Sequence, residues 1–162
     1  EQDAERFIAE HIRFKAAVVG KDERENAADI GPRSRKILNF GHTFGHALER
    51  ATDYKRFRHG EAVGHGVHFA IELSKRLEIL GQNEVNLLND VIRRVGRLPD
   101  VGGIEPGKII SALGADKKNL GNTVQWILLE GIGKPVIIPQ NQLPKGMAER
   151  AVKDYLNKNH HS

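Results

Sequence analysis

The sequence contains no cysteine, which excludes a disulfide framework and any metal site built on thiolates. A metal ion would therefore have to be held by histidine, carboxylate or water, and zinc is the first candidate. The sequence also has no apolar run of about eighteen residues and no charged-then-apolar leader, so it carries neither a membrane span nor a secretory signal. We expect a cytoplasmic protein.

Neither sign of charge dominates the sequence. Its 25 basic and 21 acidic residues leave a net charge of +4, and the basic residues are spread along the chain and form no tract. Such a distribution favours the attraction of an anionic substrate over nucleic-acid binding. The length of 162 residues is typical of one compact domain with its own core.

Apolar periodicity predicts a mainly helical fold with one small β-hairpin. Gly81 is expected to end the third helix as a C-cap, and Pro106 to begin the fifth. Strands are expected at 123–129 and 135–138, joined by a turn at 130–133. The predicted helices span about 3–19, 40–52, 60–80, 83–95, 106–113 and 144–157.

Three histidines gather around one short connection. His42 and His46 are spaced to lie on one helix face, and His59 follows at the start of the next helix. Gly41 and Gly45 each cost about 1 kcal/mol in a helix relative to alanine, so we expect a ligand or another backbone to approach closely there. The alternative is that these are ordinary surface or core histidines.

At these residues the sequence resembles the 3-dehydroquinate synthase family. The resemblance is carried by four strings and one longer run: KAAVVGKDERE from Lys15, LNFGHTFGHALE around His42, HGEAV from His59, DKK from Asp116, and the hairpin run from residues 127–129 to 132–134. Together they cover roughly residues 6–155. The resemblance implies the mainly helical C-terminal domain of such an enzyme, within which 1–162 is a single metal- and substrate-binding domain. The family's N-terminal NAD-binding domain has no counterpart here, so we expect this chain to be half of a longer enzyme, inactive by itself.

The resemblance also implies a reaction. The complete enzyme would be a lyase of the shikimate pathway that converts 3-deoxy-D-arabino-heptulosonate 7-phosphate to 3-dehydroquinate and phosphate. Its cofactors would be NAD and Zn²⁺ or Co²⁺, and the metal would be weak or absent in the C-terminal half alone. A homodimer is implied, with no nucleic-acid or membrane partner.

The roles of individual residues follow from the matched positions. His42 and His59 match the metal-binding histidines, and the third ligand would be a glutamate of the part that precedes Glu1. His46 matches the histidine that assists proton movement beside the substrate. Lys15 and Glu25 would complete the catalytic set, and Glu25 and Glu61 would orient a histidine or lysine, although Glu61 could instead favour a helix N-terminus. The matched substrate-binding residues are Arg35, Asn39, Lys117 and Lys118.

Two departures from the family pattern affect these assignments. The segment 26–34 is longer than the family's connection, so Arg33 competes with Arg35 as the carboxylate contact. After HGEAV the chain places His65 and His68, which we interpret as packing substitutions, with His65 a potential spare ligand near His59.

Three other functions remain open from the sequence. Another sugar-phosphate cyclase, such as a 2-deoxy-scyllo-inosose synthase, would keep the histidines and lysines. A metal-dependent polyol dehydrogenase would also pair a helical domain with two histidines, but would not show these strings together. A helical nucleic-acid-binding or regulatory module would bind in a salt-dependent way and would not need His42.

Overall fold

The computed structural model describes residues 2–23, 29–31, 34–120 and 123–159, without the side chains of residues 2 and 116–120. Within these ranges the fold is mainly helical with a single antiparallel hairpin, as the sequence predicts. The elements in chain order are α1 (Gln2–Val19), the 3-10 helix η1 (Arg35–Asn39), α2 (His42–Ala51), α3 (His59–Arg76), α4 (Gln82–Val95), α5 (Pro106–Leu120), β1 (Gln125–Gly131), β2 (Lys134–Pro139), the 3-10 helix η2 (Gln140–Gln142) and α6 (Met147–Lys158).

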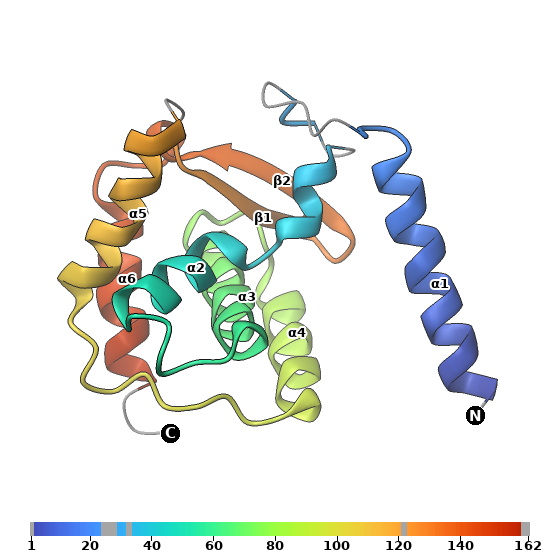
Figure 1. Cartoon of the computed structure of the whole chain (residues 1–162), viewed down its shortest axis with the longest axis horizontal. Coiled ribbons are helices and arrows are strands. Elements are labelled where there is room, and N and C mark those ends of the chain that lie inside the picture. Colours follow the sequence, from blue (N-terminus) through green and yellow to red (C-terminus); the bar gives the residue numbers. More distant parts are fainter. Residues whose placement is uncertain (1, 24–28, 32–33, 121–122, 160–162) are drawn as a thin grey trace.

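Helix α3 is the centre of the domain, with α2, α4, α6 and β1 packed around it (Figure 1). Its apolar residues are buried on several sides, as expected of a helix that lies inside a domain. Phe69 stacks on Phe44 of α2 with ring centroids 4.2 Å apart, and the ring centroid of Trp126 of β1 lies 5.4 Å from that of Phe69. The core therefore joins both helices of the histidine motif to the hairpin.

Two side-chain hydrogen bonds connect the hairpin to these helices. The hydroxyl of Thr43, the second residue of α2, donates to the carbonyl of Gln125 over 2.9 Å. The backbone N–H of Leu129 donates to the hydroxyl of Ser74 on α3 over 3.1 Å. The first bond holds the start of α2, where His42 lies, against β1, and the second holds the end of α3 against the same strand.

Helix α1 lies at the side of the domain and packs mainly against η1 (Figure 1). The helix is predicted correctly, but most of its apolar stripe is not part of the core. Phe7, Ile8, Ile12 and Phe14 are 57–63% exposed, whereas Val18 is buried.

Two predicted helix boundaries are wrong. Helix α3 ends at Arg76, and the left-handed residue beyond it is Glu78, with φ +58°. Gly81 instead precedes α4 as its N-cap, with an ordinary φ of −69°. Helix α5 also continues past the predicted end at residue 113 to Leu120.

None of the helices in the described ranges is both long and apolar enough to cross a membrane.

Candidate metal centre

The candidate site lies where the start of α2 crosses α3. Gly41 adopts a left-handed conformation, φ +84°, and turns the chain so that His42 is the first residue of α2. A Cβ atom on Gly66 of α3 would lie only 1.8 Å from the carbonyl oxygen of Gly41. The two backbones touch at this point, which explains Gly41 and Gly45 as the sequence argument expects: another backbone approaches them.

The three histidines of the motif converge at this crossing. The ring centroids of His42 and His59 are 5.3 Å apart, those of His42 and His46 5.4 Å, and those of His46 and His59 5.8 Å. One ligand nitrogen can be chosen from each ring so that all three lie within 4.8 Å of one another. His42 is partly buried, while His46 and His59 are exposed on the outer side. The cluster thus presents nitrogen atoms to an accessible position.

The environment of His42 favours the neutral imidazole that binds metals. Burial lowers the pKa of His42, and the charges of His46 and His59 lower it further, against the opposing effect of the Phe40 carbonyl. That carbonyl lies 3.4 Å from Nδ1 of His42, a long hydrogen bond in which only the ring nitrogen can donate. Nε2 is then left with a lone pair for a ligand.

Glu49, which the sequence analysis does not select, lies next to the cluster. Its carboxylate is 3.2 Å from Nδ1 of His59, and the residue is only 7% exposed. A cavity of about 400 Å³ opens beside this pair, lined by His46, Ala47, Glu49, Arg50, Tyr54, His59 and Ala112. The available signal was the position of Glu49 one helical turn after His46 within the same motif.

Glu61 acts at a helix end, and among the described residues its carboxylate makes no hydrogen bond to a histidine or lysine. Its carboxylate accepts a hydrogen bond of 2.8 Å from the backbone N–H of Arg58, immediately before α3. It therefore caps the N-terminus of α3, the alternative that the sequence analysis left open.

The predicted anion-binding residues whose side chains are described lie on α1 and η1. Lys15 is exposed on α1. Arg35 begins η1, where its backbone N–H donates to the carboxylate of Asp22 and its guanidinium to the carbonyl of Glu23. Asn39 is exposed at the end of η1.

The remaining predicted residues fall outside what the structure describes. Glu25 and Arg33 lie outside the described residues, and the side chains of Lys117 and Lys118 on α5 are likewise not described. Their proposed roles stay predictions.

His65 is a core residue and is not a spare ligand for His59. Its Nδ1 lies 2.9 Å from the hydroxyl of Tyr155 and its Nε2 lies 2.9 Å from the carbonyl of Pro99. Because that carbonyl only accepts, Nε2 donates and Nδ1 accepts from the tyrosine hydroxyl. Both ring nitrogens are therefore used in packing, as the interpretation of His65 as a packing substitution expects.

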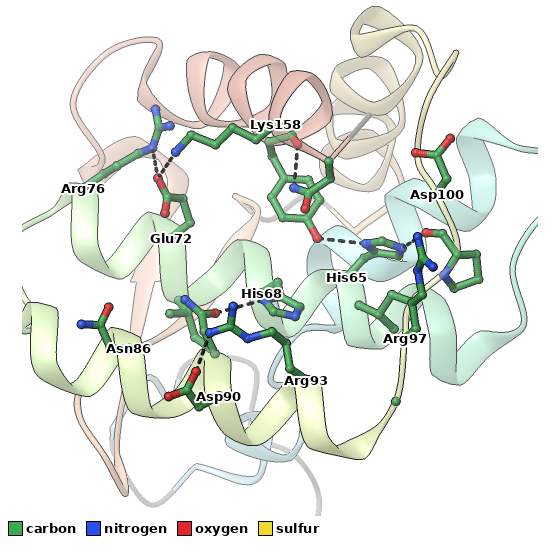
Figure 2. A pocket seen from close by; sticks show the side chains of 17 residues that line it. His65, His68, Glu72, Arg76, Asn86, Asp90, Arg93, Arg97, Asp100 and Lys158 are labelled. Atoms are coloured by element: carbon green, nitrogen blue, oxygen red, sulfur yellow. Dashed lines mark hydrogen bonds and ion pairs between the residues drawn. The ribbon is translucent and has the colours of Figure 1, made fainter. Parts of the chain in front are cut away.

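A larger groove of about 980 Å³ lies elsewhere, between α3, α4 and α6 (Figure 2). His65 and His68 line it, but its charged residues mostly pair with each other: Glu72 with Arg76 and Lys158, and Asp90 with Arg93. His68 contacts the side-chain oxygen of Asn89. The groove does not include the histidine cluster, whose chemistry makes it the stronger candidate despite its smaller cavity.

Comparison with known proteins gives the family of the chain. A family model described as 3-dehydroquinate synthase C-terminal matches residues 1–119. The 3-dehydroquinate synthase of Corynebacterium jeikeium (strain K411) is 41% identical over 129 residues, which are 80% of this chain and 33% of that protein.

Two solved structures share the fold. One is ValA, a 2-epi-5-epi-valiolone synthase from Streptomyces hygroscopicus subsp. jinggangensis 5008 with NAD⁺ and Zn²⁺ bound. Its TM-score is 0.76 over 98% of this chain and 41% of ValA, at 21% identity. A 2-deoxy-scyllo-inosose synthase complexed with carbaglucose-6-phosphate, NAD⁺ and Co²⁺ gives 0.62 over 74% of this chain and 34% of that one, at 23% identity.

The helical fold of this chain is thus the fold of these two synthases. The chain belongs to the 3-dehydroquinate synthase C-terminal family. It spans about a third of the length of the curated relatives it matches.

Proposed function

We propose that this chain is the metal- and substrate-binding part of a 3-dehydroquinate synthase. The complete enzyme would convert 3-deoxy-D-arabino-heptulosonate 7-phosphate to 3-dehydroquinate and phosphate, with NAD as a second cofactor. The observation that carries the proposal is the convergence of His42, His46 and His59 at the crossing of α2 and α3 in a member of this family.

The donor atoms fit a zinc or cobalt ion. Zinc–nitrogen bonds of about 2.0–2.1 Å place the ligand atoms of a tetrahedral site about 3.3 Å apart. The nitrogens here lie within 4.8 Å of one another, a gap that small side-chain rotations can close. His42 and His59 would hold the ion, joined by a third ligand from the part of the enzyme outside this chain. When bound, the metal would act as a Lewis acid toward a substrate hydroxyl.

His46 is proposed to serve the substrate. It is exposed on the cavity beside the cluster, where a ring nitrogen can hold or accept a proton close to a bound molecule. An imidazole ring can both hold and accept a proton, which suits this role. Its position one helical turn from His42 would place that proton transfer next to the metal.

The anion contacts would come from residues around this cluster. Arg35, Asn39, Lys117 and Lys118 are proposed to bind the phosphate and carboxylate, with Lys15 and Glu25 completing the catalytic set. Arg35 and Asn39 both lie on η1, which leads directly into Gly41 and the start of α2. A small rearrangement of η1 would therefore move both of them together with respect to His42.

Reconstitution tests the proposal. We expect no phosphate release by this chain alone, and release from 3-deoxy-D-arabino-heptulosonate 7-phosphate once it is combined with the NAD-binding half of a 3-dehydroquinate synthase. The His42→Ala variant should abolish that activity, while His68→Ala, in the separate groove, should retain it. Turnover by the chain alone, or full activity of the His42→Ala variant in the reconstituted enzyme, would overturn the assignment.

The main alternative function is a reaction on a related sugar phosphate. The two solved neighbours are cyclases for other sugars, but at 21–23% identity they report the fold alone. The curated relatives at 35–41% identity carry the 3-dehydroquinate synthase name. Assaying the reconstituted enzyme with glucose 6-phosphate alongside the heptulosonate phosphate separates these functions.

The homodimer and the cytoplasmic location stay predictions. Sedimentation of the reconstituted enzyme would test the first, and fractionation of the source cells the second.

A further inference from the structure

Glu49 is a buried acid in the wall of the candidate metal centre. It lies in the last turn of α2, and its side chain is 9% exposed, compared with 59% for the side chain of His59. Its neighbours in sequence, Ala47 and Leu48, belong to the main core. A carboxylate in such surroundings is costly unless a hydrogen bond or an opposite charge compensates it. The buried carboxylate of Glu49 therefore needs a hydrogen-bonding or charged partner, and the structure contains one.

That partner is the ring of His59. Oε1 of Glu49 lies 3.2 Å from Nδ1 of His59, and the two residues come from different helices. An ionised carboxylate can only accept hydrogen bonds, so Nδ1 carries the proton and Nε2 keeps its lone pair. Nε2 is then the nitrogen available to an ion. The contact also holds the exposed ring of His59 in one orientation toward α2, the helix that carries His42.

Nδ1 of both His42 and His59 faces a hydrogen-bond acceptor, but the two acceptors differ. The acceptor beside His42 is a backbone carbonyl at 3.4 Å, whereas the acceptor beside His59 is a carboxylate at 3.2 Å. A carboxylate on the far nitrogen of a ligand histidine fixes its tautomer and makes the other nitrogen more basic. Of the two histidines, His59 is the more exposed and has more orientational freedom to lose.

We propose that Glu49 is a positioning residue for the metal centre: it fixes the tautomer and orientation of His59 and so raises the affinity for the ion. This rests on the proposed function, in which His42 and His59 are the ligands. In this proposal Glu49 is not itself a ligand of the ion. Its action passes through the imidazole of His59, and removing it should weaken metal binding while leaving both ligands in the sequence.

The test compares Co²⁺ binding by the wild-type chain, Glu49→Gln and Glu49→Asp, followed by the absorption of the bound ion. Gln keeps the size of the side chain and removes its charge. Asp keeps the charge and withdraws it by one methylene from Nδ1. We expect each variant to bind Co²⁺ about 10–100-fold more weakly than wild type. Glu72→Gln is the matched control, because Glu72 lies about 20 Å from His59 along α3, and it should bind as wild type does.

A second measurement does not require metal. Nitrogen NMR of the metal-free protein should show His59 with its proton on Nδ1 in the wild type, and a mixture of tautomers in Glu49→Gln. A purely structural role would lower the urea midpoint without changing the tautomer. If Glu49→Gln fails to fold, the tautomer of His59 can still be compared between the wild type and Glu49→Asp.

The outcomes separate the two proposals. Wild-type protein that binds no Co²⁺, alone or in the reconstituted enzyme, would overturn the proposed metal centre, and this inference with it. Wild-type affinity in both Glu49 variants would overturn only the role of Glu49, as would a wild-type His59 with its proton on Nε2.

Discussion

The contact between Gly41 and Gly66 gives a sharp test of how the site is built. In a Gly66→Ala variant the new Cβ would lie 1.8 Å from the carbonyl oxygen of Gly41, where at least about 3.0 Å is needed. The obstacle is backbone, so α2 and α3 must separate by more than an ångström. Overpacking of this kind costs about 1–3 kcal/mol, and more where the backbone is held. Replacing glycine by alanine inside a helix stabilises the helix by about 1 kcal/mol, which offsets part of this cost. We therefore expect a net destabilisation of about 2 kcal/mol.

The matched control is Gly60→Ala on the same helix, where an added Cβ meets nothing within 4 Å. That variant should be as stable as wild type or slightly more so. Thermal and urea unfolding measure both, and for a domain of this size about 2 kcal/mol corresponds to roughly 4–8 °C. Gly66→Ala should also weaken Co²⁺ binding, because His42 follows Gly41 directly. Unchanged stability and unchanged Co²⁺ affinity in Gly66→Ala would refute the reasoning.

Three further predictions concern the core around α3. Tyr155→Phe leaves Nδ1 of the buried His65 without its donor and should cost about 1–3 kcal/mol in urea unfolding, an expectation that wild-type stability would contradict. Burial lowers the pKa of His65 and of His68, so the unfolded state takes up protons first, and stability should fall as the pH drops below about 6.5. The urea midpoint should then be lower at pH 5 than at pH 7.5, and equal midpoints would contradict a lowered pKa for these two histidines. Ser74→Ala removes the acceptor of the Leu129 N–H and should cost about 1–3 kcal/mol, whereas a neutral effect would mean that this bond between α3 and β1 contributes little.

The histidine cluster and its glycines could be predicted because both depend on local helix geometry. His42 and His46 are one helical turn apart, so a helix brings them together whatever surrounds it. Gly41 and Gly45 are unfavourable in a helix, and this cost by itself indicates that something approaches the backbone closely there. That the approaching backbone is α3, with Gly66 as its contact point, depends on how the two helices cross. No local pattern contains that crossing.

The features that sequence reasoning missed depend on tertiary packing. Glu49 looks like an ordinary helix-surface acid, and only the arrangement of α2 and α3 buries it beside His59. Gly81 matches the pattern of a C-cap, yet Glu78 takes the left-handed position because α3 ends earlier, after Arg76. Glycine preference is a tendency that neighbouring packing overrides. The anion contacts could be selected from the family motifs alone, and their grouping around the cluster remains a prediction.

His42 and His59 are proposed to bind a metal ion at the crossing of α2 and α3. X-ray absorption at the zinc edge of the zinc-loaded protein would identify the ligands, with His42→Ala, His59→Ala and the control His68→Ala measured alongside. We expect imidazole nitrogens at about 2.0–2.1 Å from zinc in the wild type and His68→Ala, and the loss of one imidazole or of the zinc itself in each of the other two variants. A wild-type protein that retains no zinc, either alone or reconstituted with the NAD-binding half, would overturn the proposed site, as would the same imidazole signal in all four proteins.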